Sequence, residues 1–276
     1  ISNQSPNDNW YLEYEGPDPG YQSLCITYLV DAWINMKRIK NLQKNNEKLI
    51  KSLQKSIYFL SYFIHPDGSY GGIYGSRNTR FYSPAGIEYL SSYLPEASAI
   101  SIELRKSIAK QKLVNLSSLD FENLIPLFNS YCWAASIINK RTSKIIRSKN
   151  KYIIPYKRRK SYRKIFKDSG LIIDSSLKHY TIISPNKGGT FLHFNKNSIA
   201  IKDNGIIIKT NRKVFLSNQI WNINNSYEIK NNELRIYSNF SKMNKNLPNP
   251  YNYLVLRLLN ISILRLRLFR EIAKQK

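Results

Sequence analysis

The residue types best suited to chemistry are concentrated in one glycine-rich stretch, residues 65–82. Four of the eleven glycines lie between Gly68 and Gly75, among polar and aromatic side chains: Asp67, Tyr70, Tyr74, Arg77, Asn78 and Tyr82. Loops that gather polar groups on a flexible backbone commonly carry binding or catalysis. No Gly-Lys-Ser/Thr follows, so the stretch is not a phosphate loop. The alternative is a long turn between helices in which Asp67 forms an Asx-turn.

A second stretch, residues 10–21, combines aromatic, acidic and turn-forming residues directly before an expected helix. Trp10 and Tyr21 are aromatic rings that can stack on sugar faces, and the carboxylate of Asp18 can accept hydrogen bonds from hydroxyls. In the alternative interpretation Asp18 caps the following helix, and the neighbouring prolines only shape the loop. We expect the two stretches to meet at a common groove that recognises an acidic sugar chain.

The elements that would position these stretches change type along the chain. Apolar residues at helical spacing predict helices over residues 21–40, 46–64, 84–93, 96–111 and 121–139. Short β-branched and aromatic runs between turn signals then predict strands over 161–167, 171–174, 178–184, 189–194, 198–202, 206–209, 213–216, 226–229, 233–240 and 253–264. The order favours an α+β multidomain protein: a helical domain (1–140), a basic linker (141–160) and an antiparallel β-sandwich domain (161–276).

Charge follows the same division. Residues 1–140 hold 14 basic and 12 acidic residues, whereas residues 141–276 hold 29 basic and 6 acidic residues. A basic half predicts an anionic partner, such as a nucleic acid, a membrane surface or a polyanionic substrate. No nucleic-acid-binding signature is found, so nucleic acid is not the expected partner.

Several classes of protein are excluded. The hydrophobic share of 42% is too high for a disordered tail, and no apolar run reaches the roughly 20 residues that cross a bilayer. Two cysteines cannot build a disulfide framework, and three scattered histidines predict no metal site and no cofactor. Because the chain starts at Ile1, we expect a fragment that lacks an N-terminal portion.

The motifs resemble those of the heparinase II/III family of polysaccharide lyases. The resemblance rests on Asp18-Pro-Gly-Tyr21 before a helix, Pro-Asp67-Gly-Ser69, Gly75-Ser-Arg-Asn78, and Lys187-Gly-Gly189 in the strand region. It implies an incomplete (α/α) toroid followed by an antiparallel β-sandwich, β-elimination on a uronic-acid polysaccharide, and a periplasmic or envelope location. The chain departs from the family pattern at one point, because it lacks a His-x-His-x-Asp run.

The resemblance also implies site residues. Tyr74 or Tyr82, with Tyr70 as a third candidate, would be the acid and base, because a neighbouring cation can lower a tyrosine pKa from about 10. Arg77 and Asn78 would bind the substrate carboxylate, and Asn9 is a candidate for a further family asparagine. The β-domain histidine would be His193 rather than His179. Asp67, Tyr70, Trp10, Asp18 and Tyr21 would contact the sugar.

Two other functions fit the same residues. One is a glycan-binding or envelope-assembly protein with this architecture and no turnover. The other is a toroidal glycosidase that uses Asp18 with Asp67 or Glu13, which requires two carboxylates roughly 5–9.5 Å apart.

Overall fold

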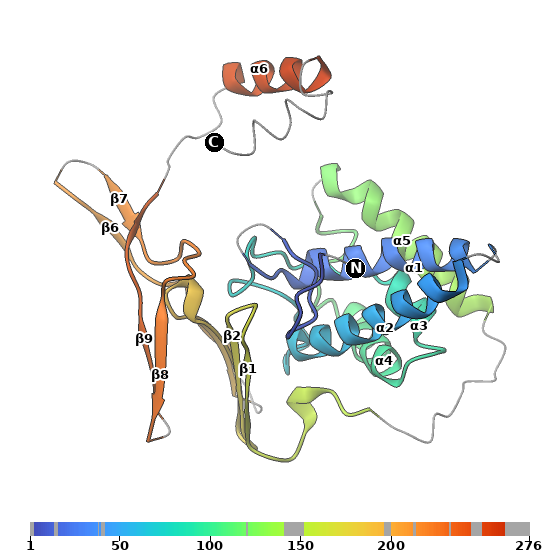
Figure 1. Cartoon of the computed structure of the whole chain (residues 1–276), viewed down its shortest axis with the longest axis horizontal. Coiled ribbons are helices and arrows are strands. Elements are labelled where there is room, and N and C mark those ends of the chain that lie inside the picture. Colours follow the sequence, from blue (N-terminus) through green and yellow to red (C-terminus); the bar gives the residue numbers. More distant parts are fainter. Residues whose placement is uncertain are drawn as a thin grey trace. The chain divides into compact units, whose positions relative to one another are not determined.

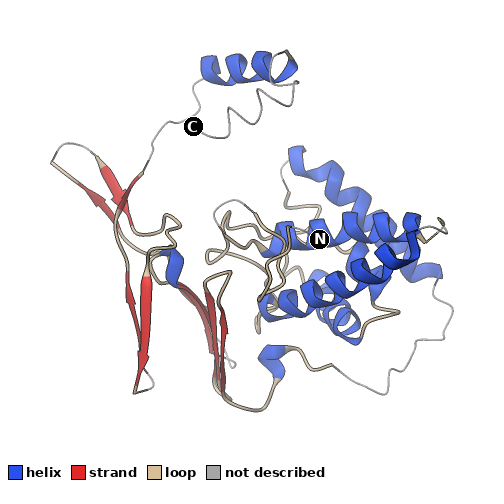
Figure 2. Ribbon diagram, in the orientation of Figure 1, coloured by secondary structure: helices blue, strands red, loops and turns tan. Residues whose placement is uncertain are grey.

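The computed structural model describes residues 3–13, 16–37, 39, 42–119, 121–140, 152–195, 200–211, 214–231, 233–243 and 250–262. The fold is mixed α+β with antiparallel sheets (Figures 1 and 2). Contacts group the chain into two units: Ile1–Ile208 with Ser217–Ser241, and Lys209–Leu216 with Lys242–Lys276. The first five helices and the largest sheet therefore belong to one unit. The predicted boundaries at residues 140 and 160 stay predictions, since residues 141–151 lie outside the described part.

Five helices form where the sequence predicts them: α1 (Pro19–Met36), α2 (Gln43–Leu60), α3 (Ala85–Leu90), α4 (Pro95–Ala109) and α5 (Phe121–Lys140). Asp18 caps α1 by accepting hydrogen bonds from the backbone N–H groups of Gly20 and Tyr21, and Pro19 occupies the first turn. Helix α1 packs on α2 and α3, and α3 also packs on α4 and α5. Ile26, Val30, Leu53, Ile57 and Ile100 fill the core between them.

The main sheet has five antiparallel strands in sequential order (Figure 1): β1 (Tyr162–Phe166), β2 (Leu171–Ser175), β3 (His179–Ser184), β4 (Thr190–Asn195) and β5 (Ala200–Asp203). Residues 167–170 connect β1 to β2, and residues 185–189 connect β3 to β4. Gly170 and Gly188 both adopt positive φ, with values of 60° and 65°, which glycine tolerates at no steric cost. In the register of β3 and β4, Tyr180 lies opposite Phe194, and Thr181 lies opposite His193.

Alternation along these strands gives the sheet two different faces. The inner face, formed by Phe166, Leu171, Ile173, Tyr180, Ile182 and Phe194, joins Phe59, Tyr62, Phe63, Trp10 and Tyr74 in a second, aromatic core. The outer face carries a row of polar residues across four strands: Arg163, Asp174, Thr181 and His193. This aromatic core fixes the sheet against the end of α2 and against the 65–82 loop.

The remaining elements are short. Strands β8 (Ser226–Lys230) and β9 (Glu233–Tyr237) form a hairpin, and β6 (Ile207–Lys209), β7 (Phe215–Ser217) and β10 (Ser241–Lys242) are brief. The predicted strand over 253–264 is wrong: α6 (Pro250–Ile261) is a helix. The apolar positions 251, 254, 255, 258 and 259 recur at helical spacing, not at every second residue. Among the described helices, none combines the length and apolar character needed to cross a bilayer.

Candidate functional site

The two predicted stretches meet at the carboxylate of Asp18. Its Oδ1 accepts hydrogen bonds from the N–H groups of Gly20 (3.0 Å) and Tyr21 (3.2 Å), and its Oδ2 accepts from those of Arg77 (3.1 Å) and Thr79 (3.3 Å). Burial raises the pKa of Asp18, and these hydrogen bonds oppose the rise. The expectation that Asp18 contacts sugar is therefore corrected. Both oxygens are taken up inside the protein, which also removes Asp18 from a glycosidase pair.

A chain of polar contacts runs from the core to the surface through the 65–82 loop. The Tyr74 hydroxyl lies 2.8 Å from Nε2 of His65, and Nδ1 of His65 lies 2.8 Å from Oγ of Ser69. The Ser69 hydroxyl donates to Oδ1 of Asp67 at 2.6 Å. Because Ser69 donates its proton to Asp67, Nδ1 of His65 carries the proton and Nε2 accepts from Tyr74. The exposed Asp67 carboxylate thus ends the chain.

Burial controls the ionisation of this chain. His65 and Tyr74 are both fully buried. Burial lowers the pKa of His65 to about 4, with a smaller opposing effect from the charge of Asp67, so the ring is neutral at pH 7. Burial also raises the pKa of Tyr74 well above 10. A lowered tyrosine pKa was the physical basis of the acid–base assignment, and at Tyr74 the shift has the opposite sign.

Tyr70, Tyr82 and Trp10 are core residues as well, each at most 4% exposed. Burial raises the pKa values of Tyr70 and Tyr82 well above 10. The Tyr70 hydroxyl donates to the Pro19 carbonyl, while the Tyr82 hydroxyl has no hydrogen-bond partner among the described residues. A substrate reaches neither the Tyr82 hydroxyl nor the Trp10 ring in this arrangement, so their predicted contacts with substrate are corrected to packing roles.

The other predicted residues of the loop lie at the surface. Arg77 and Asn78 are exposed, and the Arg77 guanidinium lies 5.6 Å from the centroid of the half-buried Tyr21 ring. Tyr21 in turn packs edge-on against Phe81, with ring centroids 5.6 Å apart. Asn78 adopts a left-handed backbone conformation (φ 54°). These side chains form an outward patch and do not line the pocket described next.

A pocket of about 240 Å³ lies between the loop and the inner side of β4 and β5, and we call it the loop–sheet pocket. Its polar side chains are Asp67, Ser69, Arg80 and Lys202, and its other lining residues are Tyr70, Gly71, Gly72, Ile73, Leu192, Phe194 and Ala200. Arg80 and Lys202 are exposed and form no ion pair among the described residues. The pocket therefore presents two uncompensated cations beside a carboxylate.

Two contacts fix the loop wall of this pocket. A Cβ on Gly71 would lie 2.2 Å from the carbonyl oxygen of Thr79, so only glycine fits where the loop folds back on itself. Nζ of Lys187 donates to the carbonyl oxygens of Ile73 and Gly75, both at 2.8 Å. Lys187 ends the 3-10 turn between β3 and β4, and so ties the loop to the sheet.

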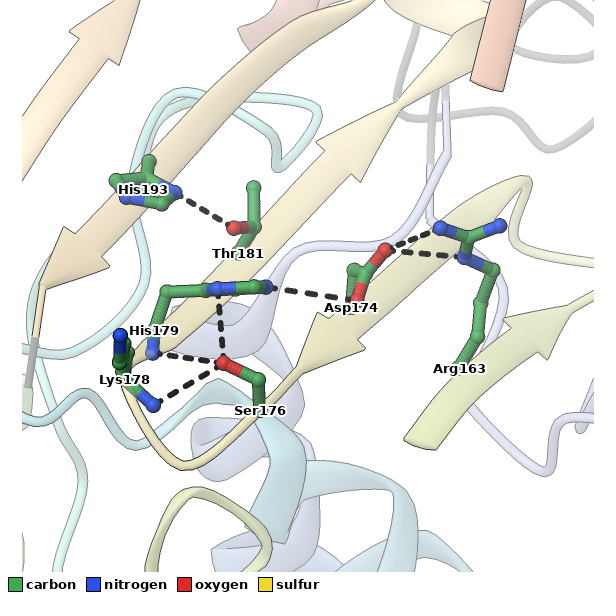
Figure 3. A network of polar contacts seen from close by, with 7 residues as sticks. All are labelled: Arg163, Asp174, Ser176, Lys178, His179, Thr181 and His193. Atoms are coloured by element: carbon green, nitrogen blue, oxygen red, sulfur yellow. Dashed lines mark hydrogen bonds and ion pairs between the residues drawn. The ribbon is translucent and has the colours of Figure 1, made fainter. Parts of the chain in front are cut away.

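His193 lies on the same face of the sheet as Thr181, Asp174 and Arg163 (Figure 3), opposite to the face that packs against Tyr74. Its neighbours Leu192 and Phe194 face the loop–sheet pocket, and alternation directs His193 outward. There its Nδ1 lies 2.8 Å from Oγ1 of Thr181, and its ring stacks on His179 with centroids 5.5 Å apart. The prediction that joined His193 to the loop tyrosines is corrected for this reason.

The outer face holds a polar network of its own, drawn in Figure 3. Arg163 Nε donates to Oδ2 of Asp174 at 3.0 Å, and Oδ1 of Asp174 lies 3.6 Å from Nε2 of His179. Nδ1 of His179 contacts Oγ of Ser176 at 2.9 Å. Burial and the charge of His179 lower the pKa of His193. Among the described residues, no group of three or more His, Cys, Asp or Glu side chains could hold a metal ion.

Sequence reasoning missed the buried partner of Tyr74 and the cations of the pocket. His65 precedes Ser69 by four residues across a turn, which is the spacing that lets the two side chains meet. Lys202 lies opposite Leu192 in the register, so strand alternation could have placed it on the inner side. No protein-family model, curated protein or solved structure matches this chain, and the site is interpreted from its own geometry.

Proposed function

We propose that this chain binds the acid groups of an anionic, uronic-acid-containing polysaccharide in the loop–sheet pocket. The observation that supports the proposal is the pair of exposed cations, Arg80 and Lys202, which line an open hollow and form no ion pair with the described residues. Hydrogen bonds to charged groups are stronger than those between neutral groups. A carboxylate that enters the pocket would compensate both charges.

The mixture of groups favours an acidic sugar over a nucleic acid. Asp67 and Ser69 line the same hollow and can accept hydrogen bonds from sugar hydroxyls. A carboxylate at this position repels any acid group placed directly against it and favours a hydroxyl there, and a polyuronate presents ring hydroxyls between its acid groups. Arg80 and Lys202 are sufficient to bind such a ligand, and binding without turnover requires no tyrosine hydroxyl in the pocket.

A second candidate is β-elimination, which the nearness of Asp67 to the two cations favours. Asp67 would take the proton on the carbon next to the substrate carboxylate, and the electron pair would form a double bond as the neighbouring C–O bond breaks. The departing oxygen would then take a proton from solvent. Arg80 and Lys202 would stabilise the negative charge that develops on the carboxylate. The resemblance to the lyase family, the toroid and the β-sandwich remain predictions. Elimination by this chain would agree with all three.

Calorimetric titration with a short oligogalacturonate tests binding. We expect Arg80→Ala and Lys202→Ala each to weaken binding by about 5- to 100-fold, because each removes a hydrogen bond to a charged group worth about 1–3 kcal/mol. Lys51→Ala is the matched control, because Lys51 is an exposed lysine on α2 that does not line the pocket. A neutral maltooligosaccharide should not bind. Equal loss in all three variants would contradict the proposal.

Turnover is tested on the same oligogalacturonate by ultraviolet absorbance, which reports the unsaturated product. We expect Asp67→Asn to abolish any such product while retaining binding within about tenfold, because the amide still accepts a hydrogen bond but cannot take the proton. New reducing ends without ultraviolet absorbance would indicate hydrolysis. Tight binding with neither signal would leave the binding function and exclude elimination of this ligand.

A further inference from the structure

Two further hollows lie in the same unit as the loop–sheet pocket. One, of about 270 Å³, is lined by Pro66, Tyr156, Lys157, Arg158, Arg159 and Leu177. The other, of about 470 Å³, is lined by Tyr152, Ile153, Arg158, Arg159 and Lys160. We call the two together the arginine groove. Arg158 and Arg159 line both hollows of the groove. Pro66 of the nearer hollow directly precedes Asp67, which lines the loop–sheet pocket.

Arg158 is held rigidly at the centre of the arginine groove. Its terminal nitrogens donate to the hydroxyls of Tyr62 and Tyr152, both at 3.3 Å. Its guanidinium also lies 5.6–5.8 Å from the ring centroids of Tyr62, Tyr152 and Tyr162. These contacts use one N–H on each terminal nitrogen, so further donors remain for a ligand. A guanidinium fixed in this way loses little conformational freedom when it binds.

The neighbouring cations differ in how far they are already compensated. Lys157 forms an ion pair with Glu103 at 2.7 Å. Burial alone would raise the pKa of Glu103, but Lys157, Lys106 and Tyr156 outweigh it and lower that pKa. Arg159 and Lys160 are exposed and form no ion pair among the described residues. The side-chain contacts of Arg158 are with tyrosines, so Arg158, Arg159 and Lys160 are the cations of the arginine groove that form no ion pair with the described residues.

We propose that the arginine groove is a second binding site for the acid groups of the same polysaccharide, so that one extended chain follows a path over both the groove and the loop–sheet pocket. The proposal rests on the function proposed above and adds the length of the ligand. Cations recur along the path at Arg80, Lys202, Arg158, Arg159 and Lys160, which matches a chain that repeats its acid group. Linked acid groups bind in succession at high effective concentration, so affinity should rise with chain length.

Titration with short, intermediate and long oligogalacturonates at constant salt tests the path. Wild-type affinity should rise with length. The double variant Arg159→Ala/Lys160→Ala should bind the short ligand as wild type does and the long ligand about tenfold more weakly, as expected for the loss of two exposed charge contacts. Lys51→Ala/Lys55→Ala removes the same charge from exposed positions on α2 and should leave both affinities unchanged.

The outcomes separate the two proposals. If the short ligand binds and affinity does not rise with length, the path is wrong and the pocket stands. If the double variant loses affinity for short and long ligands equally, Arg159 and Lys160 act at the first pocket or on folding, and the path is again wrong. If no oligogalacturonate binds the wild type, the proposed function fails, and the path fails with it.

Discussion

The two faces of the five-stranded sheet differ in how deeply their side chains are buried and in what those side chains contact. On the inner face, Tyr180 and Phe194 are at most 1% exposed and pack against helices and loop. On the outer face, Asp174 and His179 have side chains 27% and 37% exposed and interact mainly with each other and with Arg163. Removing the partner of a polar group in the inner core should therefore lower the free energy of unfolding strongly. The same change on the outer face should lower it little, because water screens the charges and replaces the lost hydrogen bond.

Neighbouring residues of β4 test this comparison most directly. We expect Phe194→Ala to reduce the free energy of unfolding by about 3–5 kcal/mol, because it opens a cavity where Phe194 stacks on His65. His193→Ala, one residue away on the outer face, should cost less than about 1 kcal/mol. Urea denaturation of both variants measures the difference. Similar losses in the two would show that the faces are not distinct in energy.

The buried histidine sets a pH dependence of stability. Burial lowers the pKa of His65 from 6.5 to about 4, so between these values the unfolded chain binds more protons than the folded protein. Stability is therefore complete above pH 6.5 and falls as the pH drops toward 4, by about 3 kcal/mol from this residue. Urea denaturation across this range should show the decline.

Two variants separate this histidine from other titrating groups. His65→Gln should flatten most of the decline, whereas His193→Gln should leave most of it in place. The His65 ring resonance in wild-type protein should titrate with a midpoint near pH 4. A midpoint near 6.5 would contradict a buried, neutral His65, even if the His65 variant does not fold.

Two tyrosines of the loop should respond differently to loss of the hydroxyl. Tyr74→Phe leaves the buried Nε2 of His65 without its donor and should cost about 1–3 kcal/mol. The Tyr82 hydroxyl has no partner among the described residues, so Tyr82→Phe should change stability by less than about 0.5 kcal/mol. Thermal denaturation of the pair provides the measurement. The reverse order would mean that Tyr82, not Tyr74, anchors the loop.

The outer-face ion pair should have the smallest effect. Asp174→Asn weakens the contact with Arg163, and because both side chains are partly exposed we expect a loss of about 1 kcal/mol or less. The loss should shrink further in high salt, which screens the pair. Denaturation at low and high salt measures both. A loss above about 3 kcal/mol would place this network with the inner core.

The sequence predicted the elements better than their contacts. The five helices and the first nine strands overlap the observed ones, because apolar periodicity and glycine-bearing turns such as Asp168–Gly170 are local signals. The contact of residues 10–21 with residues 65–82 was also predicted, and Asp18 provides it. The predicted common groove is not seen there, because no described residue of 10–21 lines the loop–sheet pocket. The helix over α6 was misread as a strand because a leucine-rich run suits both.

What was missed depends on contacts between distant residues. The aromatic richness of Tyr70, Tyr74 and Tyr82 suggested chemistry, but Tyr70 and Tyr82 are buried in the core between the helices and Tyr74 in the core against the sheet, which no local pattern states. His193 was preferred for its closeness in sequence to Gly188 and Gly189, whereas strand alternation decided which side of the sheet it faces. Counting alternate residues from Phe194 would have placed it outward.

Lys187 donates hydrogen bonds to the carbonyls of both Ile73 and Gly75, and these two bonds attach the loop wall of the pocket to the sheet. The two walls are held together before any ligand arrives, so binding needs little ordering of the backbone. The association rate of an acidic ligand would then depend on diffusion and on its attraction to the cations of the pocket. This rate should fall as ionic strength increases. Without the Lys187 side chain, the loop wall would have to become ordered against the sheet before a ligand could bind in the pocket.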